Sequence, residues 1–158
     1  MPTDQDYAAL LKRLETLEDE KRVRDLLTRY AFTVDCGDEE AMARLYSPDC
    51  VVYIDDRITL RGAEVRQIVL GEAHQSILPN CSHLMGPFVV EVDGDSATAT
   101  GYAIVCVKEE AGSRIWRQSY GRWELKKTGG KWLVAKRWSR SVGREDAHDL
   151  FRDKLSQA

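Results

Sequence analysis

A carboxylate and an imidazole, Asp35 and His83, are the residues of this chain whose types and positions best suit catalysis. Asp35 closes an amphipathic helical segment, and His83 opens a strand-like run that ends near Val92. A carboxylate that holds an imidazole fixes its tautomer and stabilises the imidazolium that forms on proton uptake. The ordinary pKa of histidine is about 6.5, and a neighbouring carboxylate can raise it toward the working pH. The pair therefore predicts a general base that removes a proton from carbon.

The first third of the chain predicts two helices that bring Asp35 into place. Apolar residues recur at intervals of three and four from Leu10 to Val34, and charged residues fill the opposite face. Gly37 is placed to end this helix, ahead of a short second helix from Glu39 to Tyr46. Asp35 thus lies at the negative end of the helix dipole, which disfavours a carboxylate by a few tenths of a kcal/mol. That cost favours a functional reason for the residue.

The rest of the chain predicts one more helix and then a meander of strands. Cys50–Ile54 is typical of a strand, and a third helix fits from Ala63 to about Ile77. Four long strand segments follow, at residues 83–92, 97–107, 114–126 and 132–142, and a terminal helix fits residues 145–156. Helices followed by antiparallel strands indicate an α+β fold. One domain is expected over residues 1–158, with its core at about residues 14–142.

Composition limits which classes of partner and which cellular compartment are expected for the protein. The chain has 158 residues, of which 43% are hydrophobic and 31% charged, and its net charge is -3. Because charges of both signs are mixed along the chain, nucleic acid is not an expected partner. No apolar run approaches the roughly 20 residues of a membrane span, and no signal-peptide pattern is visible. The four cysteines are expected to be free thiols in the cytoplasm.

No cofactor or metal is expected from the motifs. His74, His83 and His148 share no ligand spacing, and no Cys-x-x-Cys occurs. No Gly-rich motif that could cradle a phosphate is visible, which disfavours a nucleotide cofactor. Cys81 would share a strand face with His83 if the strand began at Cys81, but no oxyanion-hole motif supports a thiol nucleophile.

The segment Val23–Tyr30, followed by Asp35 and Gly37-Asp38, resembles the SnoaL-like family of the nuclear transport factor 2-like superfamily. The resemblance covers residues 14–140. It implies a cystatin-like α+β barrel, in which N-terminal helices pack on a strongly curved, mostly antiparallel sheet and enclose a conical pocket. It also implies a small-molecule substrate and a homo-oligomer, with a trimer preferred over a dimer.

Within this superfamily the chain is similar to a lyase subset: scytalone dehydratase, hexachlorocyclohexane dehydrochlorinase and bile acid 7α-dehydratase. These enzymes carry an Asp at the end of the first helix and a His after the third, positions that Asp35 and His83 hold here. Tyr30 matches a tyrosine that precedes the Asp in two of them. Arg137 follows Trp132 at the spacing of a dehydrochlorinase arginine. A functional Asp and a second His of the relatives have no counterpart in the second long strand, which offers Val105, Cys106 and Val107.

The resemblance assigns roles in an elimination. His83 would take the proton with Asp35 as its partner, and Tyr30 would donate a hydrogen bond to a developing oxyanion or a departing hydroxyl. Arg137 would hold a leaving anion or an acidic substrate, and Arg140 is the alternative if the strand register differs. Tyr30 fits core packing as well as pocket lining.

A flat apolar substrate would suit an aromatic lining, for which the candidates are Tyr53, Trp116, Tyr120 and Trp138. The sequence leaves open which sheet face lines the pocket, and the tryptophans fit a core or a subunit interface better than a substrate platform. The expected function is cofactor-independent dehydration, or a related elimination, of a small apolar cyclic molecule. Polyketide-type cyclisation or ketosteroid-type isomerisation is the second possibility, and a non-catalytic small-molecule-binding module is the third.

Overall fold

The structure is a computed structural model, and it describes residues 3–157. Its helices are α1 (Asp4–Asp35), α2 (Glu39–Ala43), η1 (Gly62–Arg66), α3 (Gln67–Leu70), α4 (Glu72–Gln75), η2 (Ala147–Leu150) and η3 (Arg152–Gln157). Its strands are β1 (Tyr46–Ile54), β2 (Ile58–Arg61), β3 (Cys81–Asp93), β4 (Ser96–Glu109), β5 (Gly112–Thr128) and β6 (Lys131–Ser141). In the described part of the chain, no helix is both long and apolar enough to cross a membrane.

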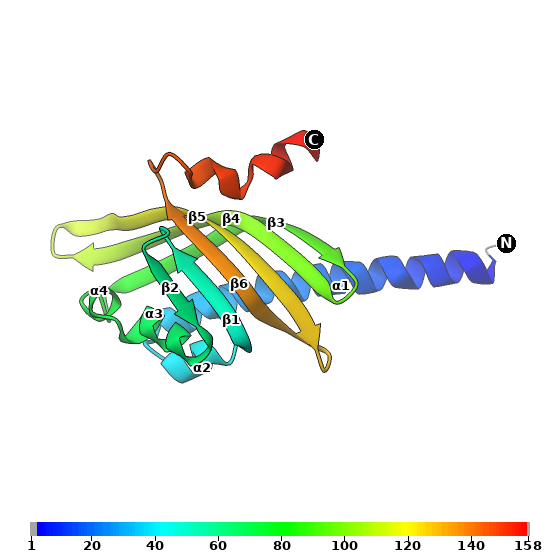
Figure 1. The fold of residues 1–158 in the computed structure, drawn as a ribbon, viewed down its shortest axis with the longest axis horizontal. Coiled ribbons are helices and arrows are strands. Elements are labelled where there is room, and N and C mark those ends of the chain that lie inside the picture. Colours follow the sequence, from blue (N-terminus) through cyan, green and yellow to red (C-terminus); the bar gives the residue numbers. More distant parts are fainter. Residues whose placement is uncertain (1–2, 158) are drawn as a thin grey trace.

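The strands form one curved sheet in the order β2-β1-β6-β5-β4-β3. Only the β1–β6 pair is parallel, and the other four pairs are antiparallel. Helix α1 and the short helices lie on one face of this sheet, and the C-terminal segment lies on the other (Figure 1). The predicted α+β fold with a mostly antiparallel sheet is confirmed.

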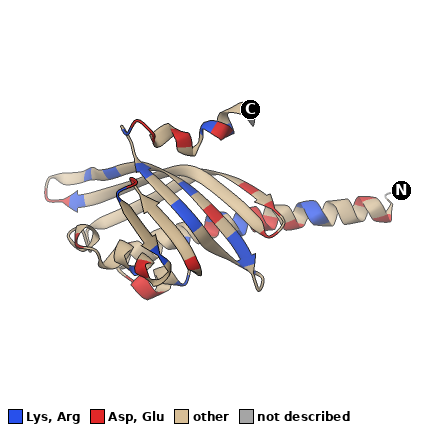
Figure 2. Cartoon of the chain, in the orientation of Figure 1, with Lys and Arg blue, Asp and Glu red and all other residues tan. Residues whose placement is uncertain are grey.

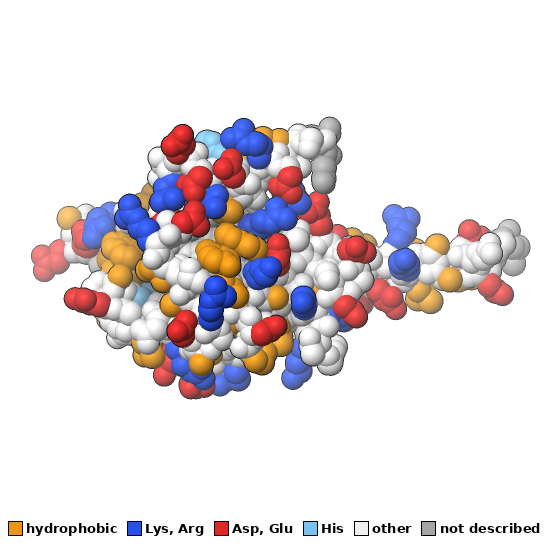
Figure 3. Space-filling view, viewed as in Figure 1, with side chains coloured by type: hydrophobic (Ala, Val, Ile, Leu, Met, Phe, Trp, Pro, Cys, Tyr) orange, Lys and Arg blue, Asp and Glu red, His pale blue; other side chains and the backbone are white. Residues whose placement is uncertain are grey.

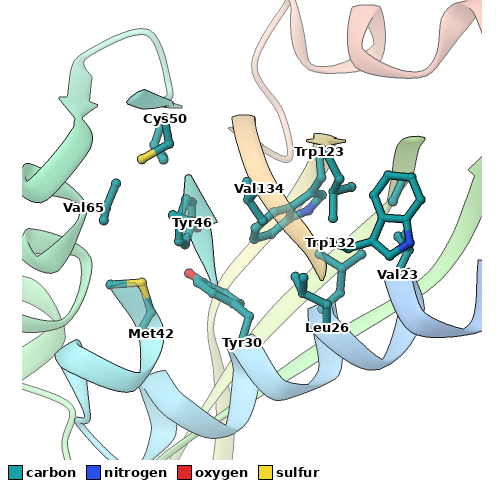
Figure 4. Packing of buried hydrophobic residues seen from close by; sticks show 14 of the residues in the cluster. Val23, Leu26, Tyr30, Met42, Tyr46, Cys50, Val65, Trp123, Trp132 and Val134 are labelled. Carbon is teal, nitrogen blue, oxygen red and sulfur yellow. The ribbon is translucent and has the colours of Figure 1, made fainter. Parts of the chain in front are cut away.

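The core lies between α1 and the sheet. Strand side chains alternate between the two faces, so Trp123 and Leu125 of β5 both point to the helix side, where each is 1% exposed. Tyr30 of α1 meets Trp123 edge-on, with ring centroids 5.1 Å apart. Figure 4 shows this contact with Leu26 and Val134 nearby. Alternation on β5 therefore fixes which residues can face the end of α1.

The predicted third helix is broken into three short pieces. Gly71 separates α3 from α4 with an extended backbone, ψ 144°. A Cβ at this position would lie 2.7 Å from the carbonyl oxygen of Gln67. The break is therefore local, and it turns α4 so that His74 is buried. The expected terminal helix is also replaced by two short 3-10 helices, η2 and η3.

Two strands begin earlier than predicted. Helix α2 ends at Ala43, and Tyr46 already belongs to β1, whereas the sequence indicated a helix through Tyr46. Strand β3 begins at Cys81 and not at His83. Cys81 and His83 therefore share one strand face.

A buried carboxylate fixes α1 on the sheet. Asp19 is 5% exposed and accepts hydrogen bonds from Lys127 Nζ (2.8 Å), Trp132 Nε1 (3.0 Å) and Arg22 Nη1 (2.9 Å). Burial raises the pKa of Asp19, but these donors outweigh it and hold the pKa at about 2. Asp19 is the first buried residue of α1, so the helix meets the sheet here.

We predict that Asp19→Asn lowers the free energy of unfolding by roughly 1–2 kcal/mol at pH 7, with allowance for solvent screening of the exposed Arg22. Because the folded-state pKa lies below the ordinary value of 3.8, this stabilisation is present above about pH 4 and is lost toward about pH 2. Urea unfolding of both proteins at pH 7 and pH 3 measures it. Asp25→Asn, which removes an exposed pair with Lys21, is the control and should lower the stability much less than Asp19→Asn does. Equal losses in the two variants would contradict the prediction.

Candidate active site

Asp35 and His83 are in direct contact. His83 Nδ1 lies 2.7 Å from Asp35 Oδ1. The backbone N–H of His83 also donates to the same carboxylate, 3.0 Å from Oδ2. Asp35 is the last residue of α1, and His83 is the third residue of β3. The carboxylate therefore holds both the side chain and the main chain of His83.

This contact decides the tautomer of His83. An ionised carboxylate only accepts hydrogen bonds, so Nδ1 must carry the proton that is shared with Asp35. In the neutral imidazole the other ring nitrogen, Nε2, then has a free lone pair. His83 is therefore arranged to take up a proton at Nε2.

The pKa of His83 is lowered from its usual 6.5, which corrects the expectation of a raised value. Burial is the largest cause, and it outweighs the opposing hydrogen bond and charge of Asp35. Electrostatic interactions with His74 and Arg137 lower the pKa of His83 further. Only 12% of the His83 side chain is exposed, which explains why burial dominates. Neutral imidazole, the form that can act as a base, therefore prevails at neutral pH.

His74 supports the pair and was missed in the sequence. It is 8% exposed, and its ring lies 5.6 Å from the His83 ring, centroid to centroid. His74 Nε2 lies 2.8 Å from the carbonyl oxygen of Val34, so Nε2 must donate. The same carbonyl also accepts from the backbone N–H of Gly37 at 3.1 Å, so His74 adds a second hydrogen bond at the end of α1. Gly71 is the sequence signal that could have revealed the role of His74, because the helix break at Gly71 turns the His74 side chain toward the core.

Arg137, not Arg140, points to the helix side. Arg137 is 9% exposed, donates to the Tyr30 hydroxyl at 2.5 Å, and lies over the rings of Tyr30 and Trp123 at 4.8 and 4.4 Å. Arg140 is held on the outer face by Asp146, 3.3 Å away. Among residues 3–157 no carboxylate lies within ion-pair distance of Arg137. A buried guanidinium of this kind favours an anionic or electron-rich partner.

The four predicted catalytic residues form two separate pairs, and in the described part of the chain no hydrogen bond joins one pair to the other. Tyr30 contacts Arg137, and Asp35 contacts His83. Five residues of α1 separate Tyr30 from Asp35, which is about 7.5 Å along the helix axis. The charge of Arg137 still reaches His83, because it lowers the pKa of that residue. Tyr30 is also a core residue, 2% exposed.

Three of the predicted aromatic lining residues lie on the opposite sheet face. Trp123 is paired with Arg137 on the α1 side, so Tyr120 and Trp138 point outward by alternation. Tyr53 stacks on Trp138 with centroids 5.6 Å apart, so it faces outward too. These residues do not share a site with His83, and this part of the prediction is wrong.

The fourth aromatic residue, Trp116, is the unpaired residue of a β-bulge in β5, and it is 38% exposed. It borders an open hollow with Gln118 and Val142. Another hollow, of about 310 Å³, lies on the outer face, where Phe151 of the C-terminal segment packs on Tyr120 at 4.9 Å. The conical pocket on the α1 side stays a prediction.

A polar cluster that the sequence reasoning missed lies on the same face as His83. Arg117 Nη1 donates to Asp55 at 2.9 Å, and Arg117 Nη2 donates to Ser139 Oγ at 3.3 Å. Asp55 also accepts from the backbone N–H of Ser141 at 2.6 Å. Alternation along β5 puts Arg117 on the same strand face as Trp123, but the sequence did not show that this face is the buried one. Its partner was not visible, because 62 positions separate Arg117 from Asp55.

Cys81 brings a third metal-ligand type beside the pair. Its Sγ lies 3.9 Å from Asp35 Oδ1, and the thiol, carboxylate and imidazole atoms lie within 4.8 Å of one another. Such donors can hold zinc. Two ligands of one tetrahedral zinc ion are separated by about 3.3 Å, given bonds of about 2.0 Å. The 2.7 Å contact of Asp35 with His83 is therefore that of a hydrogen-bonded pair. Burial also raises the pKa of the Cys81 thiol, which disfavours thiolate.

A family model described as a SnoaL-like domain matches residues 15–138. The chain belongs to the SnoaL-like family. The family includes dehydratases, cyclases and isomerases, so membership does not select one activity. No curated protein matches the chain.

Solved structures agree with the SnoaL-like assignment. An NTF2-like protein with a cystatin-like fold from Novosphingobium aromaticivorans is 28% identical, with a TM-score of 0.84 over 96% of this chain and 99% of that one. A variant of Rv3472 from Mycobacterium tuberculosis, of unknown function, is 25% identical, with a TM-score of 0.71 over 89% and 94%. A third, from N. aromaticivorans, carries a provisional assignment as scytalone dehydratase. It is 17% identical, with a TM-score of 0.69 over 80% and 85%, and supports the fold alone.

We predict that His83 titrates below 6.5 in the wild type and lower still in Asp35→Asn, because the carboxylate is what opposes the effect of burial. The substituted amide keeps an acceptor oxygen for the backbone N–H of His83, so the fold should persist. NMR of the histidine ring resonances against pH measures both values. Cys81→Ser, which changes a neighbour of Asp35, is the control and should leave the titration nearly unchanged. A His83 pKa that ignores Asp35 would refute the partnership.

Proposed function

We propose that the protein is a cofactor-independent lyase that uses the Asp35–His83 pair for a dehydration or a related elimination. The observation that carries this proposal is the 2.7 Å contact between Asp35 Oδ1 and His83 Nδ1. The contact leaves Nε2 of a mostly neutral imidazole free to act as the base. A structural histidine would need only one of the two hydrogen bonds that Asp35 accepts from His83.

The chemical step begins at Nε2 of His83, which takes a proton from a carbon next to a carbonyl or anti to a leaving group. The electrons of the broken C–H bond form a carbon–carbon double bond, and the bond from carbon to oxygen or halogen breaks. The leaving group departs as halide, or as hydroxide that becomes water with a proton that the His83 imidazolium gives up directly or through solvent. After loss of halide the imidazolium releases its proton to solvent, so the neutral base returns in either case. Asp35 stabilises the imidazolium that forms on His83.

Arg137 supports an anionic or electron-rich group in this reaction. Its guanidinium is buried without a carboxylate among residues 3–157 and donates to the Tyr30 hydroxyl. The Arg137 Nε–H has no partner in the described part of the chain. The guanidinium and the Tyr30 hydroxyl could both receive a departing hydroxyl, a halide or a substrate oxyanion.

The residues beside His83 support a small apolar substrate. Val105 pairs directly with His83, and Met85 and Ala103 share that face. Val105 and Ala103 are buried, and Met85 packs against the core. An apolar surround also explains the lowered pKa of His83. A small cyclic molecule with a hydroxyl or halogen substituent fits this chemistry.

We predict that His83→Ala and Asp35→Asn each lower kcat/KM by about 100-fold or more, as is usual for loss of a general base or its partner. Hydroxylated and halogenated cyclic compounds are the substrates to screen, and Cys81→Ser is the matched control that should keep most activity. Mass spectrometry of the product separates the alternatives, because elimination releases water or halide whereas isomerisation conserves mass. Turnover that survives His83→Ala would exclude the proposed base.

The activity should also withstand metal removal. Dialysis against EDTA is expected to change kcat by less than about twofold, because every proposed step uses side chains of the chain itself. Readdition of zinc then tests the cluster of Asp35, Cys81 and His83. Activity that is lost with EDTA and restored by zinc would replace the proposed base mechanism with a metal-assisted one.

A further inference from the structure

The N-terminal half of α1 projects from the body of the protein and carries an uncovered apolar stripe. Figure 1 shows the helix continuing well past the sheet, and Figure 3 shows its hydrophobic side chains among charged ones. Tyr7, Leu10, Leu14 and Leu17 are 56%, 60%, 51% and 61% exposed. The first buried residue of the helix is Asp19. The projecting half therefore gains nothing from the core of its own chain.

The stripe does not continue the buried face of α1. Val23 and Leu26 belong to the buried face of α1. Val23 follows Leu14 by nine positions, and Leu26 follows Leu17 by nine. At about 100° per residue, nine residues correspond to a rotation of about 180°. The exposed leucines therefore point away from the side on which the sheet lies. The spacing of three and four predicted a single face for both sets of residues, and this prediction is wrong.

The spacing of the stripe is that of a coiled-coil seam. Tyr7 and Leu14 occupy a positions, and Leu10 and Leu17 occupy d positions. Lys21 and Arg24 follow at the next a and d positions, so the apolar seam ends where the body begins. Because the seam points away from the sheet, two helices can lie together there with their bodies on the outside.

The charges beside the seam favour parallel copies of the same helix. Arg13 is at a g position, and Glu18 is at the e position five residues later. In a parallel seam, Arg13 meets Glu18 of the neighbouring copy, a pairing of opposite charges. In an antiparallel seam that aligns Leu10 with Leu14, g positions face g positions, so Arg13 would instead lie near Arg13 of the other copy, a pairing of like charges. Figure 2 shows the mixed charges along this part of α1.

We propose that copies of this chain associate through a parallel seam formed by residues 7–17 of α1. The occupant of the apolar stripe is thus the same stripe of another copy. The family resemblance implies a homo-oligomer, with a trimer preferred, but it does not indicate which surface the copies share. This inference does not depend on the lyase proposal, because it uses neither Asp35 nor His83.

Light scattering after size exclusion tests the seam. The wild type is expected to be a dimer or trimer, and Leu14→Glu with Leu17→Glu is expected to raise the dissociation constant at least tenfold. Both positions are exposed, so circular dichroism should show an intact fold. Tyr102→Glu, on the exposed outer sheet face, is the matched control. A monomeric wild type, or an oligomer that only Tyr102→Glu dissociates, would overturn the proposal.

Charge exchange tests the orientation without touching the leucines. Arg13→Glu alone and Glu18→Arg alone should each weaken association, and the two together should restore it. In a Cys36→Ser background, Leu14→Cys should form a covalent dimer under mild oxidation, and Tyr102→Cys should not. Failure of the double charge variant to recover, with no cross-link at position 14, would exclude a parallel seam.

Discussion

The arrangement of the candidate site depends on one carboxylate that binds two parts of the same residue. Asp35 accepts the imidazole N–H and the backbone N–H of His83, so the end of α1 and the start of β3 cannot move independently. The same carboxylate lies at the negative end of a helix dipole, an unfavourable place for it. Hydrogen bonds from His83 offset that cost. His74 completes the junction by binding the carbonyl of Val34.

The second constraint is a buried cation without a counter-ion in the described part of the chain. Arg137 is surrounded by the rings of Tyr30 and Trp123, which offer electron-rich faces and one hydroxyl. Such contacts recover part of the cost of removing a guanidinium from water. The rest of this desolvation cost is not recovered, so the guanidinium still attracts negative charge to the region next to His83. The lowered pKa of His83, caused by burial, and the positive charge of Arg137 are thus the two features of this region on which the proposed base chemistry rests.

Much of this arrangement could be predicted from the sequence, and the failures have physical causes. Asp35 and His83 were found from a helix end and a strand start, which are local. Arg137 came from the family resemblance, which left Arg140 open as the alternative. The direction of the His83 pKa shift could not be predicted, because burial depends on how α4 and β3 pack around the ring. The outward position of Tyr53 and Trp138 depends on strand register, and a shift of one residue reverses every face. Gly71 broke a helix that periodicity alone had extended.

The C-terminal segment, residues 142–157, covers the outer sheet face mainly through side chains: Phe151 lies on Tyr120, and Lys154 pairs with Glu91. None of its residues extends the sheet, so its length and composition can vary without changing any strand register. Selection can therefore alter the outer face of the molecule while the side that carries Asp35 and His83 is left untouched. That separation makes the segment a place where related chains can diverge with little effect on the fold.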